Sequence, residues 1–302
     1  MPDTAPSLLD YARRGRTRWY FWILTGLLTL VLALLLQIVV CVALTVALMR
    51  QTGVAAPTVL QHLMDLMQKP SDPISFFLFA GAMFGCYLVG LWLAALWLQG
   101  KRFGDLVGRW RWGTFAAGAG VWLALIAAGG LLDWVLDPKG FTVTFSPATA
   151  SLALVAILGL PIQTFAEEFM FRGWIAQGWL LATKNPIATA LLSGLMFGSV
   201  HLGNPPDGLI SAAAASCFGI ASTLIAIRLG GLAFSFGMHL VNNLWSAVVV
   251  VSSSDVFKGA PGIFSQHTSG LDWSDVGIEA LCLALVTALV YVRTRPSLPK
   301  AG

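Results

Sequence analysis

The chain has 302 residues, of which 57% are hydrophobic and only 11% are charged. A soluble globular domain carries about 25% charged residues, so this composition excludes a soluble fold and makes lipid the solvent for much of the surface. The formal net charge of +4 is small for this length and excludes a nucleic-acid-binding footprint. Four cysteines lie inside apolar runs without CxxC spacing, and we expect them to be packing residues: Cys41, Cys86, Cys217 and Cys282.

A basic segment opens the chain and precedes a long apolar stretch. Arg13, Arg14, Arg16 and Arg18 come before the run from Phe21 to Met49. A cleavable signal peptide has an apolar region of about 7–15 residues followed by a small-residue cleavage site. Because this run is far longer, we expect a retained signal-anchor helix, with residues 1–19 forming a cytoplasmic tail.

The remaining apolar runs predict a polytopic, all-α transmembrane bundle. A helix needs about 20 predominantly apolar residues to cross the hydrocarbon core of a bilayer. On that rule the sequence predicts eight spans, at residues 20–49, 74–99, 113–136, 148–166, 186–203, 208–228, 230–252 and 276–293. Residues 20–136 then hold three N-terminal spans, and 276–302 hold the last span with a short tail.

The distribution of loop charges gives an orientation to these spans. With the N-terminus in the cytoplasm, 14 of the 18 Lys and Arg residues fall on inside segments and 4 on outside segments. This bias follows the positive-inside rule. An even number of spans, with the N- and C-termini both cytoplasmic, therefore fits the sequence.

Small residues and loops add two further expectations. Gly81 and Gly85, like Gly194 and Gly198, recur at four-residue spacing, which lets helices approach closely in lipid. The segment 252–275 is expected to be an exposed surface connection. We find no internal repeat and no linker long enough to divide the chain.

Ionisable residues inside the spans are concentrated in the second half of the chain, and such residues tend to mark functional sites. Glu168 and Arg172 have the i, i+4 spacing and order of a favourable helical ion pair. This pairing would leave Glu167 unpaired and competent as a general base near neutral pH. The alternative is that both glutamates are interfacial charges at a helix end.

Two histidines also lie in apolar sequence. His201 ends an apolar run that contains Phe197, and His239 shares a helix face with Asn243 at i, i+4. Asn242 projects elsewhere and is expected to be structural. The other two histidines, His62 and His267, fall in predicted loops and are given no role.

Together, these pieces can form a complete hydrolytic site. Glu167 can take a proton from water that His201 orients, while His239 and Asn243 donate hydrogen bonds to the developing oxyanion. The same residues Glu167, His201 and His239 can instead bind a divalent metal such as zinc, with a water in the open position. Residue types alone do not choose between the two arrangements.

The three motifs EExxxR, FxxxH and HxxxN, in this order within an apolar eight-span chain, resemble the CAAX-protease and bacteriocin-processing family (CPBP, also named Abi). The resemblance covers roughly residues 150–250 and makes 148–252 the expected catalytic membrane domain. It implies that Glu167 and His201 activate water and that His239 and Asn243 stabilise the oxyanion. Family members are usually described as metalloproteases. The residues expected to support the site are Glu168, Arg172 and Phe197.

The sequence thus predicts an intramembrane endopeptidase, acting on a membrane-associated protein or peptide in a bacterial inner membrane. Other intramembrane protease signatures fit less well, since there is no HExxH and no GxSG at Ser193. Two alternatives stay open. One is a transporter or channel that relays protons or binds an ion through Glu167, His201 and His239. The other is a non-catalytic scaffold or immunity protein of the same fold.

The predicted boundaries conflict with the predicted site. Strict span counting puts Glu167 near the inner end of one helix and His201 near the outer end of the next, about 30 Å apart. We therefore expect the stretch 167–184 to stay within the membrane or bend back, with Gly173 and Gly178 easing the bend. This would set Glu167 deeper and open a wet cavity towards the cytoplasm.

Overall fold

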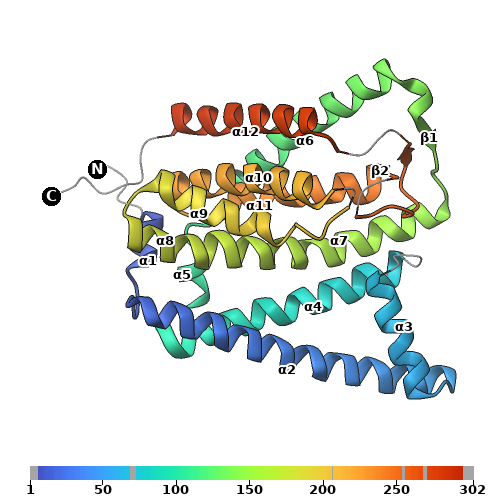
Figure 1. The fold of residues 1–302 in the computed structure, drawn as a ribbon, viewed down its shortest axis with the longest axis horizontal. Coiled ribbons are helices and arrows are strands. Elements are labelled where there is room, and N and C mark those ends of the chain that lie inside the picture. The colour runs from blue at the N-terminus through green and yellow to red at the C-terminus, as the bar shows by residue number, and fades with distance from the viewer. Residues whose placement is uncertain (1–5, 69–72, 206, 254–255, 268–270, 295–302) are drawn as a thin grey trace.

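Long helices lying side by side make up the structure, a computed structural model that describes residues 6–68, 73–205, 207–253, 256–267 and 271–294 (Figure 1). Within these residues, six helices are long and apolar enough to cross a membrane. They are α2 (Trp19–Thr52), the segment Gly81–Gln99 of α4 (Pro73–Ala94) and η1 (Ala95–Gln99), α6 (Trp112–Leu136), the continuous helix Pro147–Thr183, α10 (Gly208–Leu229) and α12 (Trp273–Arg293). The predicted all-α membrane fold is confirmed.

The two other predicted spans are helices, but they are short. The span predicted at 186–203 is α9 (Pro186–Ser199), with 14 residues. The span predicted at 230–252 is α11 (Ala233–Leu244), extended by the π-helical turn η4 (Trp245–Val249). Both fall short of the about 20 residues that a full crossing needs. The count of eight therefore separates into six full-length helices and two shorter ones within the described part of the chain.

The boundary predicted at residue 166 is wrong. The helix α7 (Pro147–Glu168) continues through a π-helical segment, η3 (Phe169–Ile175), into α8 (Ala176–Thr183). The three segments form one uninterrupted helix. The apolar run in the sequence ends at Glu167, because two glutamates and, four residues after the second, Arg172 interrupt it. The helical backbone continues through these residues.

Of the two alternatives expected for 167–184, the chain continues as part of the long apolar helix and does not bend back, and the two glycines have another use. A Cβ atom on Gly173 would lie 2.6 Å from the Leu106 carbonyl oxygen, and one on Gly178 would lie 3.0 Å from the Trp22 ring. Both positions therefore serve close packing of neighbouring segments, which only a residue without a side chain permits.

Helix packing places α7, α9, α10 and α11 in the centre. Helix α2 packs on α4, α4 on α7, α7 on α11 and α11 on α6. On the other side, α9 packs on α10 and α10 on α12. In chain order these helices, with the short α9 and α11 included, run in alternating directions (Figure 1), so the neighbours α10 and α12 are parallel to each other. The motif-bearing helices α7, α9 and α11 are thus covered by the others.

Short elements join the long helices. A helix, α3 (Ala56–Gln68), holds His62, so the prediction of a loop there is wrong. The region 252–275, expected to be an irregular surface connection, contributes a strand to a small sheet of order β1-β3-β2. His267 follows that sheet, and its Nε2 lies 3.0 Å from the Thr142 hydroxyl. The strands escaped prediction because each has three residues: β1 (Phe141–Val143), β2 (Val250–Ser252) and β3 (Phe264–Gln266).

Part of the predicted N-terminal tail is folded. Helix α1 (Leu8–Ala12) buries Leu8 and Ala12. The buried ammonium of Lys101 donates to the carbonyl oxygens of Tyr11 at 2.9 Å and Ala12 at 3.0 Å, and to Gln177 Oε1 at 3.0 Å. These three acceptors satisfy the charge of Lys101 and join the N-terminal segment to α8.

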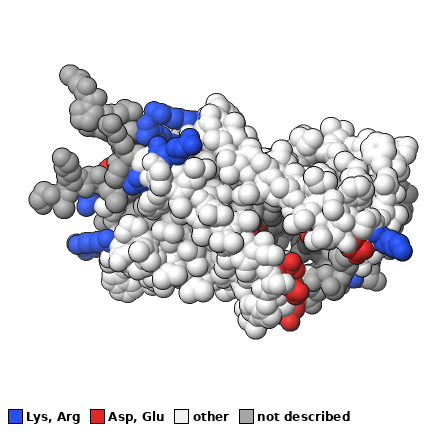
Figure 2. Space-filling view, turned by 90° about the horizontal axis from the view of Figure 1, so that it is seen from above, with Lys and Arg blue, Asp and Glu red and all other residues white. Residues whose placement is uncertain are grey.

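The charge distribution agrees with the predicted orientation. Helix α1 begins and α12 ends at the same end of the molecule (Figure 1). Lys and Arg side chains gather mostly at that end, whereas the visible Asp and Glu side chains lie towards the opposite end (Figure 2). One residue counted as an inside loop charge, Arg172, instead lies within the long helix Pro147–Thr183. The cytoplasmic location of the basic end stays a prediction.

Close packing at the small residues is confirmed. A Cβ atom on Gly194 would lie 2.6 Å from the backbone nitrogen of Ile220, and one on Gly198 would lie 2.4 Å from the Ala212 carbonyl oxygen. Both contacts are to α10. Gly81 approaches the Cα of Gly159 on α7 in the same way, at 3.1 Å. These glycines fix how closely α9 and α4 sit on their neighbours.

The Gly194 contact can be tested by a single methyl group. We expect Gly194→Ala to lower the stability by about 1–3 kcal/mol, because the added Cβ meets backbone atoms of α10 that cannot rotate away. The midpoint of thermal unfolding of the full chain in detergent measures this. Gly120→Ala on α6 is the matched control, since a Cβ there meets nothing within 4 Å. Equal midpoints for the two variants would contradict the packing.

Candidate active site

The length of the helix Pro147–Thr183 sets the depth of Glu167. At the α-helical rise of about 1.5 Å per residue, the stretch from Pro147 to Glu167 covers about 30 Å. In the other direction, Gly173 already touches the Leu106 carbonyl oxygen and the Leu232 side chain. Glu167 therefore lies within about 10 Å of the level of those two residues, measured along the helix. The two residues lie on the side of Glu167 that faces the basic end of the molecule.

The short helix α9 brings His201 to the same depth. It starts at Pro186, directly after α8, and runs back antiparallel to it (Figure 1). The distance from Pro186 to His201 is about 22 Å, and that from Thr183 back to Glu167 is about 24 Å. The conflict between the predicted boundaries and the site is thus removed, because α9 ends inside the bundle and does not cross it.

Four ionisable side chains form a row at the centre of the bundle. Arg172 Nη1 lies 3.0 Å from Glu168 Oε1, which confirms the predicted i, i+4 ion pair. The same Glu168 oxygen lies 2.9 Å from His239 Nδ1. The other ring nitrogen of His239, Nε2, lies 3.4 Å from Glu167 Oε2. Because both nitrogens face carboxylates, an imidazolium satisfies both contacts, and the row then alternates in sign from end to end.

The row is buried to different degrees along its length. The side chains of Arg172 and Glu168 are fully buried, whereas 7% of His239 and 13% of Glu167 are exposed. The Arg172 guanidinium also lies 4.3 Å from the centre of the Phe197 ring, so a second favourable contact replaces the water it has lost. Glu167 is thus the end of the row that other molecules can reach.

Glu167 is not unpaired, contrary to expectation. In addition to His239, it accepts a hydrogen bond from Gln163 Nε2 at 2.6 Å. The ion-pair spacing correctly assigned Arg172 to Glu168, but it gave no information about partners from other helices. Each carboxylate oxygen of Glu167 therefore faces a side-chain nitrogen, Oε1 that of Gln163 and Oε2 that of His239.

The ring of Phe197 packs against the rings of both His201 and His239. Its ring centre lies 4.6 Å from that of His201 and 5.7 Å from that of His239. His201 Nδ1 lies 2.8 Å from the Phe197 carbonyl oxygen, which can only accept. Nδ1 must therefore carry the hydrogen, and in the neutral ring Nε2 is left as an acceptor. Within the described residues, His201 makes no hydrogen bond or ion pair with Glu167.

Asn243 reaches the site through a residue that the sequence analysis missed. Its Nδ2 donates to Gln163 Oε1 at 3.1 Å and to the Thr164 hydroxyl at 3.2 Å. The signal available in the sequence was the i, i+4 spacing of Gln163 and Glu167, which puts them on one helix face. Asn242 accepts instead from Trp122 Nε1 at 3.1 Å, as its predicted structural role requires.

The metal interpretation of this cluster stays a prediction, and the present arrangement does not favour it. In the described part of the chain, no group of three or more His, Cys, Asp or Glu side chains is placed to hold a metal ion. His239 Nδ1 is engaged by Glu168 at 2.9 Å, and only its Nε2, 3.4 Å from Glu167, faces the candidate base. We therefore derive no step of the reaction through a metal.

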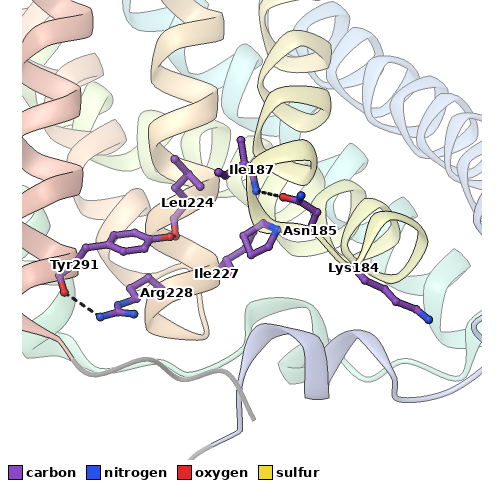
Figure 3. A pocket seen from close by; sticks show the side chains of 8 residues that line it. Lys184, Asn185, Ile187, Leu224, Ile227, Arg228 and Tyr291 are labelled. Atoms are coloured by element: carbon purple, nitrogen blue, oxygen red, sulfur yellow. Dashed lines mark hydrogen bonds between the residues drawn. The ribbon is translucent and has the colours of Figure 1, made fainter. Parts of the chain in front are cut away.

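A cavity of about 360 Å³ at the basic end is separate from this site (Figure 3). The polar groups that line this cavity form hydrogen bonds at the ends of helices. Asn185 accepts from the Ile187 amide at the start of α9, and the Arg228 guanidinium donates to the Tyr291 carbonyl oxygen near the end of α12. The Lys184 side chain points away from the other labelled residues. None of the predicted catalytic residues lines this cavity.

The buried ion pair makes a prediction about stability. Arg172→Met should destabilise the protein by about 3–5 kcal/mol, because Glu168 would keep a buried charge without its main counter-ion. The double variant Arg172→Met/Glu168→Gln should recover much of that loss. Unfolding midpoints in detergent measure both, with the exposed Arg50→Met as a control. A single variant as stable as the native chain would contradict the assigned pairing.

Comparison with known proteins concerns the same region of the chain. Residues 149–245 match the family model described as "Type II CAAX prenyl endopeptidase Rce1-like". This range includes all three motifs and lies within the predicted segment 148–252. The chain is also similar to "Uncharacterized protein YyaK" of Bacillus subtilis (strain 168), with 28% identity over 211 residues that cover 67% of this chain and 71% of that protein. No solved structure matches the chain.

The predicted resemblance is therefore confirmed. Residues 149–245 of this chain, whose long apolar helices indicate an integral membrane protein, are similar to the Rce1-like type II CAAX prenyl endopeptidases.

Proposed function

We propose that this chain is an intramembrane endopeptidase that hydrolyses peptide bonds of a membrane-associated protein or peptide. One observation carries the proposal. The partly exposed carboxylate of Glu167 accepts a hydrogen bond from Gln163 and lies 3.4 Å from His239 Nε2, while its neighbour Glu168 is fully buried and neutralised by Arg172. A general base must be held in position and be accessible to the water from which it takes a proton. The carboxylate of Glu167 meets both requirements. The family match supports the reaction class.

In the first step, Glu167 takes a proton from a water molecule. The water oxygen attacks the carbonyl carbon of the scissile peptide bond, and the carbonyl oxygen becomes an oxyanion. His201 Nε2, left as an acceptor by the bond from Nδ1 to Phe197, accepts the second hydrogen of the water and orients it. General base catalysis of this kind contributes about 10²–10⁴ to the rate.

The same proton transfer releases a donor for the oxyanion. Once Glu167 is protonated, it attracts His239 Nε2–H less strongly, and negative charge appears on the substrate instead. The His239 ring, held at Nδ1 by Glu168, then donates to the oxyanion. We give Asn243 a supporting place next to the base, because its Nδ2 already donates to Gln163 Oε1 and to the Thr164 hydroxyl. The row Arg172, Glu168 and His239 thus supplies positive charge where the transition state needs it.

Collapse of the intermediate completes the hydrolysis. The carbon–nitrogen bond breaks, and Glu167 returns its proton to the leaving amine. The products are a new carboxylate and a new amino terminus. Because Glu167 starts and ends ionised, the row of four side chains is regenerated without any external reagent.

The surroundings of the site favour a substrate held at the membrane. Glu167 lies near the middle of the helix Pro147–Thr183, at a depth of about 30 Å along it from Pro147, in a bundle whose outer surface is apolar. A peptide reaches that depth most readily when its chain is anchored in, or attached to, the same bilayer. We propose a bacterial inner membrane as the location, with the basic end in the cytoplasm.

A co-expression assay tests the proposal. The full chain is produced with a library of single-span reporter proteins whose juxtamembrane sequences are randomised, and released reporter is measured. The native chain should cleave a subset of the library. Glu167→Ala and His201→Ala should each reduce release by about 10²-fold or more, because the base or the water-orienting group is lost.

Two controls make the assay decisive. His267→Ala should leave release unchanged, since His267 lies beside β3 and outside the site. Membrane insertion of each variant is checked by its abundance in the membrane fraction. Undiminished release in both site variants would contradict the catalytic assignment and return the choice to a transporter or a non-catalytic scaffold.

A further inference from the structure

We propose that Gln163 is a positioning residue, which orients the Glu167 carboxylate and couples it to Asn243. This inference rests on the proposed function of Glu167. Gln163 precedes Glu167 by one helical turn on α7, and its Nε2 donates to Glu167 Oε1 at 2.6 Å. Its carbonyl Oε1 accepts from Asn243 on α11 at 3.1 Å. Gln163 therefore stands between two residues of the candidate site.

The orientation of the Gln163 amide is determined by its neighbours. Its Oε1 accepts two hydrogen bonds, one from Asn243 Nδ2 and one from the Thr164 hydroxyl at 3.2 Å. An amide turned the other way would point its NH₂ group at the Asn243 NH₂ and its oxygen at a carboxylate. Both contacts would be repulsive, so the donor end of Gln163 must face Glu167.

The consequence for Glu167 is a fixed carboxylate plane. The terminal torsion of a glutamate is broad, so a single donor leaves the group free to rotate. Here the short hydrogen bond from Gln163 on α7 holds one oxygen, and the other lies 3.4 Å from His239 Nε2 on α11. These two contacts from separate helices limit the direction in which the remaining lone pairs point. A base is effective only when such a lone pair meets the proton that it must take.

Gln163, which contacts Glu167, has no charge, whereas Arg172, which contacts Glu168, is a cation. Arg172 neutralises Glu168, and a cation in the same place beside Glu167 would weaken it as a base. A neutral amide can orient the carboxylate while leaving most of its negative charge available. The chemistry of Gln163 therefore suits a residue that positions a general base.

Asn243 acts on Glu167 through this amide. Both hydrogens of its NH₂ group are engaged in the structure, one with Gln163 and one with the Thr164 hydroxyl. Removal of the Asn243 side chain would thus also free the Gln163 amide to turn. The effects of removing Asn243 and Gln163 should therefore overlap and not multiply.

Kinetics of the full chain in lipid vesicles, with a reporter peptide chosen by the co-expression assay, test the inference. Gln163→Leu should lower kcat by about 10- to 100-fold, as expected for loss of a hydrogen bond to a charged group, with KM changed by less than about threefold. Gln163→Glu keeps the shape but lacks the NH₂ donor, and it should be impaired as strongly. A role in packing alone would leave Gln163→Glu close to native activity.

The chain contains a matched control for this contact. Gln61 donates to Asp65 at 2.9 Å with the same i, i+4 spacing on the exposed helix α3. Gln61→Leu should leave kcat and KM unchanged. The double variant Gln163→Leu/Asn243→Ala should be about as slow as the slower single variant. Multiplied effects would show that Asn243 acts independently and would overturn the coupling.

Glu167→Ala in the same assay separates the two proposals. If Glu167→Ala is inactive while Gln163→Leu and Gln163→Glu keep native kcat, the positioning role is wrong and the proposed function stands. If Glu167→Ala cleaves like the native chain, the proposed function itself fails. Unfolding midpoints of the Gln163 variants near that of the native chain are expected, and a large drop in both would indicate a structural role instead.

Discussion

A charge inside an apolar bundle is stable only when an opposite charge or several hydrogen bonds replace the water it has lost. The centre of this protein is arranged around that constraint. Arg172, Glu168, His239 and Glu167 contact each other in sequence, and their charges alternate when His239 is protonated. Breaking the row at any member leaves an uncompensated charge, so the row holds η3 and α11 together and fixes Glu167, its most exposed member.

Helix length then decides where this row lies. The helix Pro147–Thr183 is much longer than a bilayer crossing requires, so the charged residues sit well inside it and not at its end. The short α9 ends at Ser199, so His201, two residues later, lies at about the depth of Glu167. A long helix beside a short one brings residues from two neighbouring segments to the same depth. The π-helical segment η3 starts directly after Glu168. Short π-helical segments within α-helices are frequent at functional sites.

The sequence was informative where structure depends on local spacing. The ion pair of Glu168 with Arg172, the shared face of His239 and Asn243 and the close approach at Gly194 all follow from helical periodicity. The depth of the site did not follow, because a run of glutamates and arginine ends the hydrophobic signal without ending the helix. Gln163 was missed because a neutral polar residue in an apolar helix carries no signal of its own. Its partner Asn243 is 80 residues away, and only the fold brings them together.

The central claim is that Glu167 serves proteolysis at the membrane. It is tested most directly by comparing the new N-termini in the membrane proteome of a strain carrying the native chain with those in a Glu167→Ala strain. The account predicts a small set of N-termini, within or next to membrane-spanning segments, that are present with the native chain and absent with the variant. Identical sets of N-termini in the two strains, at equal levels of the inserted protein, would contradict it.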